Sequence, residues 1–122
     1  MSEGKSRLLR TAQRQARALS DLSGCKLNQA QMTLAIDVFG YMSWAKLKSA
    51  IQNGELPEIK ACLLDWEHEN TALLISVIKT NWQDWSINFS QIKYLKGIET
   101  KKIISHILKI DELELDKIIN RD

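Results

Sequence analysis

The residues best suited to chemistry in this chain are basic side chains on a predicted helix near the C-terminus. Lys101, Lys102 and Lys109 occupy the side of the segment 100–110 that faces away from its isoleucines, and Ser105 lies among them. Lysine ammonium groups bind phosphate in contacts that weaken with salt and do not depend on base sequence. Ser105 is the one outward side chain suited to a base-edge hydrogen bond, and serine discriminates weakly between bases. This pattern is typical of contact with a nucleic-acid backbone, and it is equally typical of the solvated face of an amphipathic helix.

A second set of basic side chains repeats along the segment 6–22, which has the periodicity of a helix. Its arginines recur at intervals of three and four residues and share one face, namely Arg7, Arg10, Arg14 and Arg17. Guanidinium groups bind phosphate bidentately and also pair with carboxylates. The arginine face could therefore flank DNA, bind RNA or dock on an acidic partner. The arginines could equally be exposed to solvent, or they could pair within the molecule with the acidic stretch 57–86.

Charge is distributed in blocks, although the net charge of the 122 residues is only +2. Residues 1–26 hold six Lys or Arg against two acidic residues, and residues 87–110 hold five against one. Residues 57–86 and 111–122 each hold two basic residues against five acidic ones. An anionic partner would therefore meet local patches rather than a general positive field.

The sequence offers no constellation for catalysis, and we expect neither an enzyme nor a metal or cofactor site. His68 and His106 are far apart, and Cys25 and Cys62 form no CxxC motif. A glycine-rich phosphate loop, a nucleophile elbow and an HExxH motif are all missing. Without a signal-like or membrane-spanning apolar run, we expect no membrane association, a cytoplasmic location and reduced thiols.

Composition and periodicity predict an all-α protein, because Thr and Val are scarce and 44% of residues are hydrophobic. Asn28 and Ser43 are the expected N-caps of two helices. The predicted helices are 6–22, 27–39, 44–52, 57–66, 69–82, 88–96 and 100–110, followed by a helix or short strand at 111–119. The break at residues 54–57 divides an N-terminal helical lobe, 1–54, from a C-terminal lobe, 57–122, and the two lobes could share one core.

The segments 88–96 and 100–110, joined at Gly97, have the layout of a helix-turn-helix, whose second helix commonly enters the major groove of DNA. Residues 72–110 resemble the helix-turn-helix core of bacterial and phage winged-helix proteins. The positions that carry this resemblance are Phe89, Ile92, Gly97, Ile98, Ile103, Ile107 and Ile110. The resemblance implies that helix 100–110 binds DNA. The chain departs from the family at 111–114, where an acidic run replaces the basic, glycine-containing entry to a β-wing. We therefore expect a winged-helix-like domain without a full wing.

Residues 27–51 are similar to a short helical module of bacterial and plasmid-borne proteins that has no established activity. The matching positions are Ala30, Gln31, Gly40, Tyr41, Ser43, Trp44, Leu47 and Lys48. Leu34 and Ala35 are offset by one residue from the usual spacing of that module. The similarity implies a bacterial or mobile-element origin and no particular activity.

Two hypotheses follow from the sequence. The first is a small regulatory protein of bacterial, phage or plasmid origin that binds double-stranded DNA through the C-terminal helix-turn-helix. The second is a non-enzymatic adaptor or inhibitor whose charged helical faces engage another protein. The turn at Gly97 and the lysines of 100–110 favour the first hypothesis, whereas the acidic stretches 57–86 and 111–122 favour the second.

Overall fold

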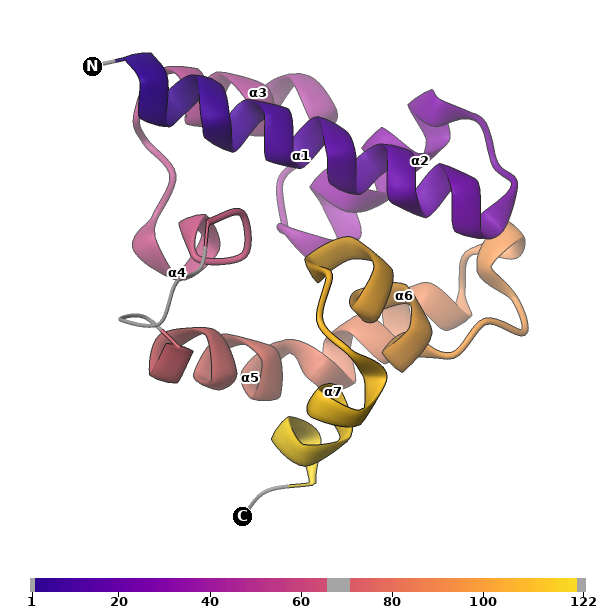
Figure 1. Cartoon of the computed structure of the whole chain (residues 1–122). Coiled ribbons are helices and arrows are strands. Elements are labelled where there is room, and N and C mark those ends of the chain that lie inside the picture. The colour runs from indigo at the N-terminus through magenta and orange to yellow at the C-terminus, as the bar shows by residue number, and fades with distance from the viewer. Residues whose placement is uncertain (1, 66–70, 121–122) are drawn as a thin grey trace.

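The computed structural model describes the backbone of residues 2–65 and 71–120 and the side chains from residue 6 onward (Figure 1). Within those ranges every regular element is helical and no strand occurs, which confirms the all-α class. The elements are α1 (Ser2–Ser23), α2 (Leu27–Thr33), the π-helix η1 (Leu34–Val38), α3 (Trp44–Gln52), α4 (Glu58–Ala61), α5 (Thr71–Ser90), the 3-10 helix η3 (Lys93–Leu95), α6 (Thr100–Leu108) and α7 (Glu112–Ile119). None of the described helices is both long enough and apolar enough to cross a membrane.

The N-terminal boundaries show how local capping decides where helices begin. The Ser43 hydroxyl accepts the backbone N–H of Lys46 at 3.1 Å, so α3 begins where its cap predicts. The expected cap at Asn28 is wrong. Instead, α2 begins after Lys26, whose backbone N–H donates to the side-chain oxygen of Gln29 at 3.0 Å. A reciprocal glutamine three residues into the helix therefore sets this boundary.

The two separate helices predicted at 69–82 and 88–96 are wrong. The α5 helix runs without a break to Ser90, because Trp85 and Phe89 continue its buried face and no helix-breaking residue intervenes. Residues 91–99 then connect α5 to α6 through η3, with Gly97 at a φ of +83°. This connection is longer than the three- or four-residue turn of a compact helix-turn-helix.

Two further segments differ from their predicted form. Only Glu58–Ala61 of the helix expected at 57–66 is helical, and a turn follows it. The segment 111–119 is helix α7 rather than a strand, because the Asp111 carboxylate accepts the backbone N–H of Leu113 at 3.0 Å and caps the helix. Residue 66, the first two residues of the predicted helix 69–82 and His68 lie outside the described residues.

One buried cluster holds the chain together, and it includes residues from both sides of the break at 54–57. The α1 helix packs on α2, α3 and α6, while α5 packs on α6, α7 and η1. Figure 1 shows α6 below α1, and α7 below α6 with α5 behind it. Ala12, Ala16 and Leu19 of α1 belong to the same cluster as Ile103 and Ile107 of α6. The N-terminal arginine helix is therefore placed against the C-terminal lysine helix.

Candidate nucleic-acid interface

The α6 helix divides into a buried and an exposed face. Its core positions are Ile103, Ile104, Ile107 and Leu108, followed by the buried Ile110. The exposed side chains are Lys102, His106 and Lys109, which recur at i, i+4 and i+7, and Ser105 is half-buried beside them. Lys109 ends the helix in the left-handed conformation, with a φ of 57°. The outward face of α6 is thus a short basic stripe, as expected for two of its three lysines.

Lys101 differs from its neighbour Lys102 because it is engaged within the molecule. Its Nζ lies 3.1 Å from the Asp116 carboxylate of α7, and only 29% of the Lys101 side chain is exposed. The hydrogen bond to Asp116 raises the pKa of Lys101, so the ammonium stays charged. A phosphate would have to compete with Asp116 for this ammonium group.

The arginine face is divided in the same way. The Arg7 guanidinium lies 2.7 Å from the Asp65 carboxylate. This ion pair joins the arginine face to the acidic stretch 57–86 within the molecule. Arg14 is half-buried, and its Nη2 donates to the backbone carbonyl of Ile107 at 3.3 Å. Burial lowers the pKa of Arg14. Arg10 and Arg17 are exposed.

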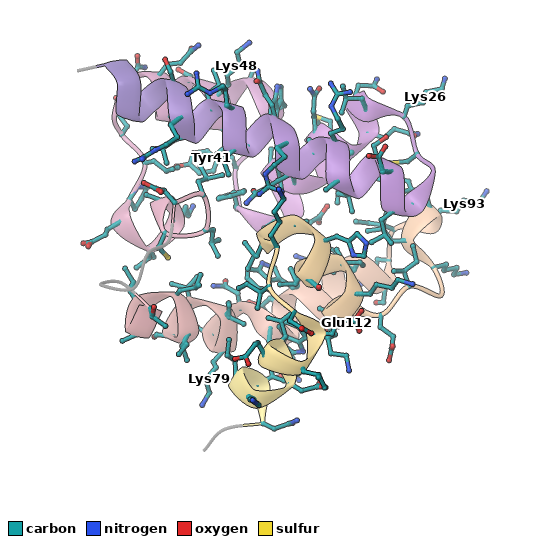
Figure 2. The ribbon with its side chains drawn as sticks, in the orientation of Figure 1. Lys26, Tyr41, Lys48, Lys79, Lys93 and Glu112 are labelled. Carbon is teal, nitrogen blue, oxygen red and sulfur yellow. The ribbon has the colours of Figure 1, made fainter. Side chains whose placement is uncertain are left out.

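Arg14 joins the two basic segments into a single surface. The carbonyl that it contacts belongs to the last turn of α6, where the partial negative charge of the helix dipole favours a cation. Arg10 and Arg17 lie three or four residues from Arg14 on the same side of α1, and Lys109 follows Ile107 by two positions. Figure 2 shows α1 directly above the upper end of α6, with which it is in contact. We refer to Arg10, Arg14, Arg17, Lys102, His106 and Lys109 as the α1–α6 face.

His106 adds a titratable group that the sequence did not single out for this surface. Its Nδ1 lies 2.8 Å from the carbonyl oxygen of Lys102, so a neutral ring donates from Nδ1 and keeps the lone pair of Nε2 for an outside partner. The position of His106, four residues after Lys102 and three before Lys109, could have identified it as a member of the stripe.

Acidic residues border the α1–α6 face on the α7 side and near the end of α1, where the exposed Asp21 lies four residues after Arg17. Glu99 is exposed immediately before α6, and Glu112 and Asp116 belong to α7, which packs on α6. Figure 2 places Glu112 beside the α6 and α7 ribbons. The positive charge therefore concentrates on the arginines of α1 and the outward side of α6, away from the α7 side.

The described residues contain no group of three or more His, Cys, Asp or Glu side chains arranged to hold a metal ion. Cys62 is buried, and burial raises the pKa of its thiol, which makes it a poor nucleophile at neutral pH. No family model matches the chain, and no curated protein or solved structure is detectably similar to it.

Proposed function

We propose that this chain is a small regulatory protein of bacterial, phage or plasmid origin that binds double-stranded DNA through the α1–α6 face. The observation that supports this proposal is the packing of α1 on α6, which brings the arginine and lysine stripes onto one surface. Two basic stripes that are remote in the sequence thereby form a wider phosphate-binding surface than either helix offers alone. The protein would act in the cytoplasm, where Cys25 and Cys62 remain reduced.

The chemistry of the face favours the DNA backbone over the bases. Lys102, Lys109, Arg10 and Arg17 are cations suited to phosphate contacts, whereas His106 and the adjacent Ser105 offer hydrogen-bonding groups of other kinds. Phosphate contacts position a protein on the duplex and carry no sequence information. We therefore propose tight but weakly selective binding, with any base readout coming from Ser105 and His106.

The proposal is tested by fluorescence anisotropy with a labelled random-sequence duplex at about 50 mM salt, where phosphate contacts are strong. The wild-type protein should bind, and Lys102→Ala/Lys109→Asn and Arg10→Ala/Arg17→Ala should each bind more weakly. Asparagine replaces Lys109 because it tolerates the left-handed backbone there. The matched control is Lys46→Ala/Lys93→Ala, which removes two exposed lysines from α3 and η3. A wild-type protein that does not bind under these conditions would contradict the proposal.

A protein-interaction adaptor is the alternative function, and the internal ion pairs favour it. Lys101 and Arg7 are engaged by Asp116 and Asp65, so two of the seven predicted basic contacts are already occupied. An absence of duplex binding, together with binding of the same face to an acidic protein surface, would support the adaptor instead.

A further inference from the structure

A cavity of about 300 Å³ opens between η1, α4 and α5, away from the α1–α6 face. Its apolar walls come from all three regions and include Ile36, Phe39, Leu63, Val77 and Trp85. Its polar groups are Asp37 on η1, Lys60 on α4, and Asn81, Asp84 and Asn88 on α5. Asn81, Asp84 and Asn88 recur at i, i+3 and i+7 and therefore share one face of α5. The size suits a single side chain or a small ligand.

The polar groups of this cavity are mostly hydrogen-bond acceptors. The side-chain amide of Asn81 donates to the Val77 carbonyl at 2.8 Å, and that of Asn88 donates to the Asp37 carbonyl at 3.3 Å. Each amide therefore commits a donor to the backbone and keeps its carbonyl oxygen for another partner. The carboxylates of Asp37 and Asp84 take part in no hydrogen bond or ion pair among the described residues. These acceptor oxygens, together with the one N–H that each amide keeps, can receive a donor from outside.

The cavity holds one cation of its own, and this cation is directed elsewhere. The Nζ of Lys60 lies 4.4 Å from the centre of the Tyr41 ring, in a cation–π contact at the edge of the cavity. Lys60 lies more than 4.0 Å from either carboxylate, since it forms a salt bridge with neither. Burial raises the pKa of Asp37, as expected for a carboxylate without a compensating cation. The charge of the cavity is thus complementary to an incoming ammonium or guanidinium group.

The wall that carries Asp37 is held in an unusual conformation. The η1 segment is a π-helix, in which the backbone N–H of Phe39 donates to the Leu34 carbonyl at 3.1 Å. The carbonyl of Val38 at its end accepts the indole N–H of Trp85 at 3.2 Å. Short π-helical segments are rare and occur frequently at functional sites. Here the side chains of α5 fix the turn that presents Asp37 to the cavity.

Apolar side chains surround the cavity and indicate what kind of molecule would carry the cation. Ile59, at its edge, is 54% exposed and Ile36 is 41% exposed. A second hollow of about 260 Å³ adjoins the first, because Ile36 and Asp37 line both, and it contains Met32, which is 42% exposed. A small free amine would leave these side chains in water. A peptide with apolar residues on either side of a cation would cover them.

We propose that this cavity binds an arginine or lysine side chain of a partner protein, whose flanking apolar residues cover Ile36, Ile59 and Met32. The charged head would lie among the acceptor oxygens of Asp37, Asp84, Asn81 and Asn88, and its alkyl stem would pack on the apolar walls. This site is separate from the proposed DNA-binding face and does not depend on it.

The test is a titration of ¹⁵N-labelled full-length protein with three probes, followed by NMR. The probes are acetyl-Leu-Arg-Leu-amide, the same peptide with neutral citrulline in place of arginine, and free agmatine. The arginine peptide should shift the side-chain signals of Asn81, Asn88 and Trp85. It should also bind about tenfold more tightly than either other probe, because charge-assisted hydrogen bonds and apolar cover are both needed.

Variants separate the cavity from general charge attraction. Asp84→Asn, and the double variant Asp37→Asn/Asp84→Asn, should reduce affinity for the arginine peptide by about tenfold or more. The double variant Asp21→Asn/Glu99→Gln removes two exposed acids elsewhere and should leave that affinity unchanged. Asp84 is itself exposed, so Asp84→Asn should keep the fold. No shift at millimolar peptide, equal binding of the citrulline peptide, or equal binding of agmatine would each overturn the proposal.

Discussion

Lys101 and Lys102 are adjacent and identical in type, yet the structure predicts that only one of them contributes to duplex binding. The Lys101 ammonium is held 3.1 Å from Asp116, whereas Lys102 is exposed on the α1–α6 face. If the proposed function is correct, Lys102→Ala removes a phosphate contact, whereas Lys101→Ala removes an ion pair within the protein. The two variants therefore form a matched comparison in which the charge removed is the same.

The expected difference follows from the release of counterions. Each lost contact with duplex DNA should flatten the slope of log K against log salt by about 0.9. Between 50 mM and 200 mM salt, that change corresponds to a factor of about 3 to 4 in affinity per contact. Lys102→Ala should show this full effect, whereas Lys101→Ala should keep the wild-type slope. Asp116→Asn should steepen the slope by up to about 0.9, the value for one contact, because it frees the Lys101 ammonium for a phosphate.

The assay is fluorescence anisotropy of a labelled duplex at four or more salt concentrations, with circular dichroism to check that each variant is folded. Equal flattening by Lys101→Ala and Lys102→Ala would refute the reasoning, since it would mean that Asp116 does not withdraw Lys101 from the duplex. A slope that neither variant changes would show that Lys102 makes no phosphate contact with the duplex.

Three further predictions concern stability and pH. Trp85→Phe should lower the free energy of unfolding by about 1–3 kcal/mol in a urea titration, because the buried Val38 carbonyl loses its donor; an unchanged midpoint would contradict this. Ile107→Asp should abolish the helical circular dichroism signal, since an unpaired carboxylate at a position with 0% exposure costs several kcal/mol. Burial raises the pKa of Asp37 in the folded protein above its ordinary 3.8. Ionisation of Asp37 therefore favours the unfolded chain as pH rises through the pKa of the folded protein. Asp37→Asn should therefore be more stable than wild type at neutral pH and should lose this advantage below about pH 3.8; an advantage that grows on acidification would contradict the assignment.

Local patterns in the sequence were sufficient where a single helix decides the outcome. Ser43 has the side chain that an N-cap needs, and α3 begins directly after it. Ile103 and Ile107 of α6 recur with helical spacing and are buried as that spacing requires, whereas Ile110, predicted in the same helix, is buried beyond the end of α6 at Leu108. Both features depend on residues within two turns of each other, so neighbouring sequence determines them.

Tertiary contacts decided the features that the sequence could not supply. The π-helix η1 depends on Trp85 and Asn88, which donate to its carbonyls across 47 and 51 positions in the chain. The pairing of Lys101 with Asp116 requires residues 111–119 to turn back on α6 as a helix. The sequence predicted either a helix or a short strand for that segment. Residues 34–38 form η1, where the backbone takes up more residues per turn than an α-helix. Periodicity analysis assumes a regular helix and so does not anticipate this segment.

If the protein binds DNA as proposed, the acidic helix α7 limits the directions from which a duplex can approach. It occupies the side of α6 next to Lys101, and its own carboxylates would repel phosphates that passed there. A duplex would therefore lie across α1 and the outward side of α6, with Lys102, Lys109 and the arginines of α1 along its phosphates. In that orientation the N-terminal turn of α6 does not lead into the major groove, as it would in a compact helix-turn-helix. Binding would then depend on the arginines of α1 as much as on α6, and removing either set should weaken it to a similar extent.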